Sequence, residues 1–244
     1  MPSHSSSLIN KYNKIFFEFR NQPYVKIEVV PLWQKIIKRL LDIITALAGL
    51  IILLPLLIYI GIRIKLDSKG SIFYIQERVG YNGIPFTIYK FRSMYEDAEN
   101  DGPVLSSADD NRVTKWGSTI RKWKLDELPQ LLNILIGDMS LVGPRPERKY
   151  YIDKVSAIYP YFKYLHQVKP GLTSLGMIKF GYAQNIEQII QRMRYDITYI
   201  ESYSLFLDLQ IVYYTFLSII DDKMFTTSIK LRIRLPRVKI PTLN

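Results

Sequence analysis

Two adjacent carboxylates, Asp126 and Glu127, stand out in the stretch KWKLDELPQLLN. Proline disfavours helix at the residue before it and suits the first helical position, so we expect a helix from Pro129 through Leu135. The carboxylates would then lie immediately outside a helix N-terminus, where the helix dipole stabilises anions. Neighbouring side chains point in different directions, so one carboxylate can reach a substrate while the other holds a cation. The alternative is that the pair only caps the helix.

Basic residues surround this pair in three short motifs. Arginine suits phosphate because its planar fork forms two parallel hydrogen bonds, and the prolines on both sides of Arg145 would stiffen the backbone that carries it. Each cluster alone is typical of a solvated surface, but together with the acidic pair they indicate a diphosphate substrate and a divalent ion. The basic residues are Lys90, Arg92, Arg121, Lys122, Lys124, Arg145 and Arg148.

The composition of the 244 residues narrows the chemistry further. There is no cysteine, which excludes disulfides, thiolate nucleophiles and cysteine-ligated zinc. Only two histidines are present, which argues against a histidine-rich metal site and a Ser-His-Asp triad. An enzyme of this composition would therefore use a carboxylate as acid, base or nucleophile. The net charge of +11 favours acidic partners, namely nucleic acid, phosphorylated metabolites or anionic membrane.

A long apolar segment, LLDIITALAGLIILLPLLIYIGI, covers Leu40 to Ile62 and has the length of a membrane helix. Pro55 interrupts it, and proline bends or breaks a helix. Because positive charge prefers the cytoplasmic side, a helix that enters the membrane, bends at Pro55 and returns would keep both flanking basic clusters in the cytoplasm. A kinked spanning helix and a buried core helix are the alternatives. The flanking residues are Lys35, Lys38, Arg39, Arg63 and Lys65.

The rest of the chain predicts an α+β fold that is mainly helical with a small β-hairpin. Residues 71–94 contain two β-prone runs joined by Asn82-Gly83, a strong hairpin signal. Residues 117–135 have helical spacing with a break near Pro129, while residues 137–149 and 168–176 are typical of turns. The final predicted helical stretch, 185–220, ends in an apolar segment that we interpret as a core or interfacial helix.

Four segments follow from these patterns. We expect an N-terminal extension (1–34), a re-entrant membrane helix (35–66), a cytoplasmic catalytic domain with interfacial helices (67–222) and a basic C-terminal tail (223–244). No apolar run follows the start closely, so we expect no cleaved signal peptide. The tail is basic and free of acidic residues, which suits anionic lipid headgroups.

Several motifs in this order and spacing resemble the bacterial sugar transferases, the monotopic phosphoglycosyl transferases of surface-glycan assembly. They are KFRSM, LDELPQLLN, GDMSLVGPRP and the proline-interrupted apolar segment, and the resemblance covers about 40–220. It implies transfer of a sugar 1-phosphate from a UDP-sugar to polyprenol (undecaprenyl) phosphate, with release of UMP. It also implies a re-entrant helix at the bacterial inner membrane and an active site that faces the cytoplasm.

The resemblance also implies roles for individual residues. Asp126 matches the nucleophile, which forms a phosphosugar–aspartyl intermediate, and Glu127 matches the residue that positions Mg²⁺. Arg121 and Arg145 match arginines at the substrate phosphates. The KFRSM motif at the same site contains Lys90 and Arg92, which we include as phosphate-binding candidates.

Two departures from the family pattern concern the bend and the sugar side of the site. The family often breaks its membrane helix at Ser-Pro, whereas this chain has Leu54-Pro55. Many members have threonine then glycine after the Pro-Gly turn, whereas Ser174 and Leu175 precede Gly176 here.

Two other function classes are weighed against this one. A membrane-tethered nucleic-acid binder would suit the basic tail and the 18 tyrosines, but no nucleic-acid motif is present and we expect no nucleic-acid partner. A non-catalytic membrane scaffold would make the carboxylates incidental. A homodimer is compatible with the sequence, which does not fix the oligomeric state, the sugar or the polyprenol length.

Overall fold

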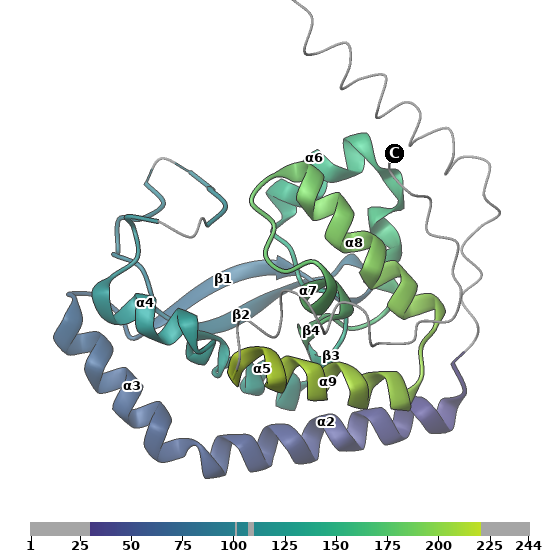
Figure 1. The fold of residues 1–244 in the computed structure, drawn as a ribbon, viewed down its shortest axis with the longest axis horizontal. Helices are drawn as coiled ribbons and strands as arrows, with labels where there is room; N and C mark the ends of the chain where they lie inside the picture. The colour runs from purple at the N-terminus through teal and green to yellow at the C-terminus, as the bar shows by residue number, and fades with distance from the viewer. Residues whose placement is uncertain (1–29, 101, 107–109, 221–244) are drawn as a thin grey trace, which may run out of the picture.

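The computed structural model describes residues 30–100, 102–106 and 110–220; the rest of the predicted N-terminal extension and the basic tail lie outside these residues. The described part is mainly helical and contains two small two-stranded sheets. This confirms the predicted mainly helical architecture with a β-hairpin. In Figure 1 two long helices run along one side of the molecule, and all other elements lie on the concave side of the angle between them.

The two long helices are α2 (Leu32–Ile52) and α3 (Leu54–Asp67), which meet at a bend of 62°. Pro55 lies in the first turn of α3, where its missing N–H cannot continue the hydrogen-bond ladder of α2. The bend predicted at Pro55 is therefore confirmed, even without the serine that often precedes this proline in the family. No single helix in the described ranges is long and apolar enough to cross a membrane, whereas the bent pair together meets that criterion.

Helix α2 has one face on the rest of the molecule and one exposed face. Lys38, Asp42, Ala46 and Leu50 recur every four residues and face inward; Ala46 is fully buried in a cluster with Leu131 and other residues of α5 and β2. The opposite face exposes large apolar side chains, and α3 continues this pattern. The exposed set includes Leu40, Leu41, Ile44, Leu47, Ile51, Ile52, Leu54, Ile58 and Ile62.

The predicted hairpin forms from β1 (Phe73–Val79) and β2 (Pro85–Phe91), which pair antiparallel. Asn82 and Gly83 adopt positive φ angles of 56° and 75° in the turn, a conformation that these two residue types tolerate best. In Figure 1 the hairpin runs between α4 (Lys115–Lys122) at one end and the C-terminal helices at the other.

The helical stretch after residue 115 is interrupted earlier than the sequence predicted. Helix α4 ends at Lys122; Lys124 then has a positive φ of 54° and is followed by a 3₁₀ turn, η2, over Leu125–Glu127. Pro129 then precedes α5 (Gln130–Ile136), one residue from the predicted start. The carboxylates therefore lie in a separate 3₁₀ turn between α4 and α5. The helical stretch is interrupted at Lys124, which adopts the left-handed conformation.

A second sheet forms where the sequence predicted only turns, and this expectation is corrected. Strands β3 (Ser140–Val142) and β4 (Gly171–Thr173) pair in parallel. Two glycines permit this pairing, because a Cβ atom added at Gly143 or Gly171 would collide with the backbone of the other segment. The strand pair positions the GPRP segment, which follows β3 directly.

The C-terminal part of the domain packs five helical elements around the largest apolar core. The predicted helical stretch after Asn185 forms two helices, which are separated where the first one ends before Ser202. The short α7 accounts for the departures noted at 174–176: Ser174 caps it, and a Cβ at Gly176 would collide with α8. The elements are α6 (Lys149–Ile158), η3 (Pro160–Gln167), α7 (Leu175–Lys179), α8 (Ile186–Glu201) and α9 (Leu205–Ile220).

Candidate active site

Glu127 lies at the centre of the candidate site and is paired with two cations. Its Oε1 atom accepts hydrogen bonds from Lys90 Nζ at 3.0 Å and from Arg145 Nη2 at 2.9 Å. The three residues come from β2, η2 and the loop after β3, so three separate segments meet at one buried carboxylate. The structure thereby brings together three of the six predicted site residues.

The two cations keep Glu127 ionised despite its burial. Burial opposes ionisation, but the charges of Arg145 and Lys90 and their hydrogen bonds lower the pKa of Glu127 well below its usual range. Burial also lowers the pKa of Lys90 from its ordinary value, an effect that the negative charge of Glu127 opposes. The result is a fixed negative charge enclosed by fixed positive charges.

Asp126 has a different environment from its neighbour. It is half-buried. Among the described residues, the ion pairs with Lys90 and Arg145 are made by Glu127 and not by Asp126. Burial and the negative charge of Glu127 raise the pKa of Asp126 to about 6, against the charges of Lys90, Arg121 and Arg145. Asp126 is therefore the more basic carboxylate of the pair, yet it remains mostly ionised at neutral pH.

Arg121 lies in the last turn of α4 and completes the positive surroundings of Asp126. Its charge acts on Asp126, and its Nη1 atom is buried without a hydrogen-bond partner in the part of the chain that the structure describes. A buried guanidinium nitrogen without an acceptor is unfavourable, so this atom is suited to a ligand oxygen.

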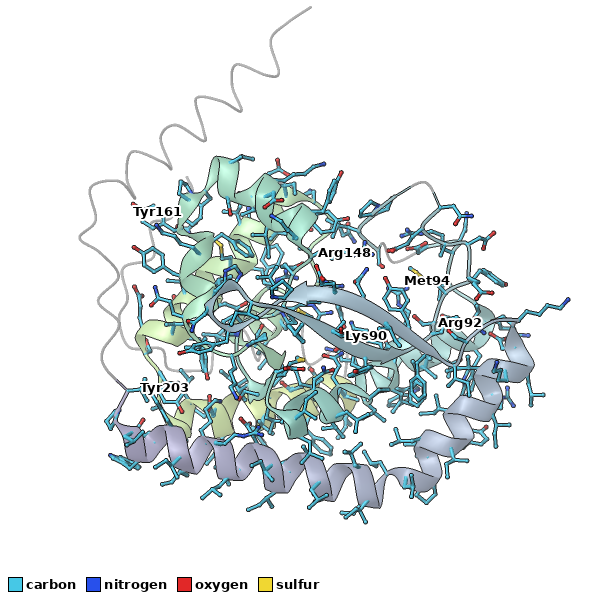
Figure 2. The ribbon with its side chains drawn as sticks, turned by 180° about the vertical axis from the view of Figure 1, so that it is seen from behind. Lys90, Arg92, Met94, Arg148, Tyr161 and Tyr203 are labelled. Atoms are coloured by element: carbon cyan, nitrogen blue, oxygen red, sulfur yellow. The ribbon has the colours of Figure 1, made fainter. Side chains whose placement is uncertain are left out.

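Arg92 lies apart from the other predicted site residues. Figure 2 shows Lys90 along the hairpin and Arg92 at its end, beside α3. The buried Arg92 guanidinium donates to the carbonyl oxygens of Ser68 at 2.8 Å and Lys69 at 2.7 Å, just after the end of α3. A phosphate contact by Arg92 stays a prediction, while its observed contacts bind the hairpin to the bent helix pair.

Ion pairs outside the immediate site hold the PRPER segment in place. Glu147 is buried between Arg78, at 3.8 Å, and Arg192 of α8. Arg148 pairs with Glu99 and donates to the hydroxyl of Tyr74 at 3.1 Å. Because both residues that follow Arg145-Pro146 are anchored, the backbone that carries Arg145 is fixed on its C-terminal side.

Tyr182 is a residue at the site that the sequence did not single out. Its ring centroid lies 5.2 Å from Arg145 Cζ and 5.6 Å from Lys124 Nζ. It follows Gly181, which has a positive φ of 94°, in the segment between α7 and α8. The sequence contains 18 tyrosines, and no residue pattern around Tyr182 distinguishes it as a site residue.

The donor set fits Mg²⁺ that is shared with a substrate. Among the described residues no three His, Cys, Asp or Glu side chains are grouped as a metal cage. Mg²⁺ prefers oxygen ligands and is commonly bound by one or two carboxylates together with substrate phosphates. Asp126 and Glu127, surrounded by cations that would bind the same phosphates, match that mode of binding.

Comparisons with known proteins identify the family of this chain. The family model described as bacterial sugar transferase matches residues 33–222. The chain is 40% identical over 184 residues to an Aeromonas hydrophila protein named UDP-N-acetylgalactosamine-undecaprenyl-phosphate N-acetylgalactosaminephosphotransferase, covering 75% of this chain and 44% of that protein. It is 42% identical over 179 residues to a UDP-glucose:undecaprenyl-phosphate glucose-1-phosphate transferase of Caulobacter vibrioides, covering 72% and 66% respectively.

A third relative matches over most of its own length. A sugar transferase of Bacillus subtilis is 38% identical over 177 residues, which cover 72% of this chain and 84% of that protein. By contrast, the chain spans less than half of the Aeromonas relative. The matched residues begin at the second residue of α2 and contain every later described element through α9. The chain belongs to the bacterial sugar transferase family.

Proposed function

We propose that this protein transfers a sugar 1-phosphate from a UDP-sugar to polyprenol (undecaprenyl) phosphate. The observation that carries the proposal is the contrast within the carboxylate pair. Glu127 is buried and bound by Lys90 and Arg145, whereas Asp126 is half-buried with a raised pKa. The names of the relatives support the donor and acceptor classes.

In the first step, a carboxylate oxygen of Asp126 attacks the phosphorus next to the sugar. A new bond forms between this oxygen and phosphorus, and the bond from phosphorus to the bridging oxygen of the diphosphate breaks. UMP leaves with that bridging oxygen, and the phosphosugar remains on Asp126 as an acyl phosphate. Arg121 and Arg145 bind the donor phosphates and stabilise the charge that develops on them.

In the second step, a phosphate oxygen of polyprenol phosphate attacks the same phosphorus. The bond to Asp126 breaks, the carboxylate is restored, and a polyprenyl-diphosphate sugar is the product. Both substrates are anions that repel each other. A covalent intermediate separates the transfer into two steps, so the phosphates of the two substrates need not react directly with each other. Lys90 keeps Glu127 ionised and in place throughout.

Glu127, together with the substrate phosphates, would hold Mg²⁺. A bound Mg²⁺ neutralises phosphate charge and so favours attack by an anionic carboxylate. The paired cations orient the Glu127 carboxylate through Oε1, so the same contacts that lower its pKa also fix its position.

The exposed apolar face of α2 and α3 is proposed to lie in the cytoplasmic leaflet of the bacterial inner membrane. In this arrangement the bend of 62° would let the helix pair enter and leave the membrane on the same side, with the catalytic domain in the cytoplasm. The site would then lie where a soluble UDP-sugar and a membrane-bound polyprenol phosphate both arrive.

Intact-mass measurement of the detergent-solubilised protein tests the proposal. Incubation with Mg²⁺ and a panel of UDP-sugars, without acceptor, should release UMP and add one sugar phosphate to the protein. Asp126→Asn protein should gain no mass, and hydroxylamine should remove the adduct from the wild type. A strict requirement for both substrates before any UMP appears would instead indicate direct transfer.

A further inference from the structure

Tyr182 contacts the site without belonging to the apolar core. Its side chain is 53% exposed, whereas the next residue, Ala183, is buried in the largest core cluster. The buried Ala183 anchors the backbone beside Tyr182, so the Tyr182 ring is held at the surface of the domain. This ring is placed over the guanidinium of Arg145, at 5.2 Å from the ring centroid.

The contact matters because of what else Arg145 does. One nitrogen of its guanidinium, Nη2, is bound to Glu127 at 2.9 Å, and the central carbon, Cζ, lies over the Tyr182 ring at 5.2 Å from its centroid. The hydrogen bond holds one nitrogen of the group, while the ring limits movement of its central carbon. The orientation of the guanidinium, and so the direction of its remaining N–H groups, is fixed by the two contacts together.

Lys124 brings a second cation to the same ring, at 5.6 Å. Lys124 lies at the left-handed turn directly before η2, which carries Asp126 and Glu127. The ring thus lies against cations from both segments of the site, the GPRP loop and the approach to the carboxylates. An electron-rich ring face lessens the repulsion between two positive groups that would bind one diphosphate.

We infer that Tyr182 is a positioning residue for the donor diphosphate, acting through the aromatic contact of its ring with Arg145 and Lys124. This inference rests on the proposed function for the identity of the donor. It requires the aromatic ring and does not require the hydroxyl. It also requires that the effect extend to any diphosphate, whether or not a nucleoside is attached.

The test compares Tyr182→Leu and Tyr182→Phe with wild type, and uses Tyr150→Leu as a matched control. Tyr150 is also exposed and also covers a cation, Lys154, but it lies on α6. The readouts are KM and kcat for the UDP-sugar, and the binding of UDP and of inorganic pyrophosphate with Mg²⁺ by calorimetry. Melting temperatures check that the variants fold.

Tyr182→Leu should raise KM and weaken both UDP and pyrophosphate by about 3- to 30-fold, the range of a cation–π contact, with a smaller effect on kcat. Tyr182→Phe should stay within about twofold of wild type. The inference is overturned if the leucine variant binds normally, if phenylalanine is as damaging as leucine, or if only UDP is weakened, which would indicate a base contact. Calorimetry needs no turnover, so failure of the proposed reaction is seen separately, as absence of UMP release by the wild type.

Discussion

Lys38 of α2 and Asp208 of α9 form an ion pair, with Nζ 2.7 Å from Oδ2, between the bent helix pair and the last described helix. The same ammonium donates to the carbonyl oxygen of Val142 at 2.9 Å, at the end of β3. Figure 2 shows Tyr203, whose ring is 5.8 Å from this ammonium, beside the first half of α2. The strand that leads to Arg145 is therefore held directly by the helix that we propose to lie in the membrane.

Replacement of Lys38 by methionine should lower the free energy of unfolding by about 2–4 kcal/mol, because the largely buried Asp208 would lose its cation and keep the neutral Tyr199 hydroxyl as a donor. Thermal unfolding in detergent measures the effect. Lys35→Met is the matched control, since Lys35 is exposed on the same helix. Equal melting temperatures for the two variants would contradict the structural role of the Lys38–Asp208 pair.

Asp126→Asn should abolish the adduct and at the same time stabilise the protein. The folded-state pKa of Asp126 is about 6, above the ordinary value of 3.8, so ionisation in the folded state is unfavourable above pH 6. The asparagine variant should gain about 1–3 kcal/mol at pH 7; the gain should shrink as the pH falls through about 6 to 4 and vanish below about pH 3, where Asp126 is protonated in both the folded and the unfolded state. Unfolding curves from about pH 3 to 8 check this; a gain that grows as pH falls would refute it.

Glu127→Gln should reduce turnover about 10- to 100-fold, because the amide loses the charge that Lys90, Arg145 and Mg²⁺ would share. Its shape is nearly unchanged, so the loss should be partly recovered at high Mg²⁺ by mass action. Rates measured across a Mg²⁺ series distinguish this role from catalysis by the carboxylate itself. A loss that is independent of Mg²⁺ would remove Glu127 from the metal site.

Arg92 and Arg121 should respond differently to replacement by lysine. Lysine at 92 cannot reproduce the guanidinium contacts to Ser68 and Lys69, so the melting temperature should fall while KM for the UDP-sugar stays unchanged. Lysine at 121 should raise KM by about tenfold with little loss of stability, because the proposed partner of Arg121 Nη1 is a substrate phosphate. Should Arg92→Lys raise KM at an unchanged melting temperature, Arg92 would be a phosphate ligand after all.

The topology of the bent pair is tested with single cysteines at Gln34 and Lys69, since the chain contains no cysteine. Lys69 is preferable to Ser68, whose hydroxyl accepts a hydrogen bond from Arg92 at 3.0 Å. Both sites should react from the cytoplasmic side of sealed vesicles. Pro55→Leu should move a fraction of the protein to a spanning form, in which Gln34 and Lys69 label from opposite sides.

Features with a local cause were predictable from sequence. The turn at Asn82-Gly83 needs positive φ angles, and the bend at Pro55 follows from a missing N–H, so neighbouring residues suffice to predict both. Lys124 has a positive φ without being Gly or Asn, and only the packing of α4 and η2 around it explains the break. Tertiary packing also decides that Lys90 contacts Glu127 while Arg92 contacts the residues after α3, so no local pattern could predict their different positions.

Residue chemistry suggested that the basic clusters and the acidic pair serve one substrate, and the family resemblance assigned a role to each residue. Lys90, Glu127 and Arg145 are far apart in sequence, and spacing alone does not bring them together. Tyr182 was missed because its relation to Arg145 exists only in three dimensions. The parallel pairing of β3 with β4 was missed because three-residue strands lack a periodic pattern.

Two charged residues of α2, Asp42 and Lys38, have partners that lie far away in the sequence. The Asp42 carboxylate accepts hydrogen bonds from the Ser140 hydroxyl and the Leu141 amide, which lie 98 and 99 residues later in the sequence. Lys38 donates to Asp208, which lies 170 residues later. Before these later segments fold, Lys38 and Asp42 can pair with each other, because they lie at positions i and i+4 of one helix. Docking of α2 therefore replaces this local ion pair with contacts to β3 and α9, which makes the helix dependent on contacts of high sequence separation.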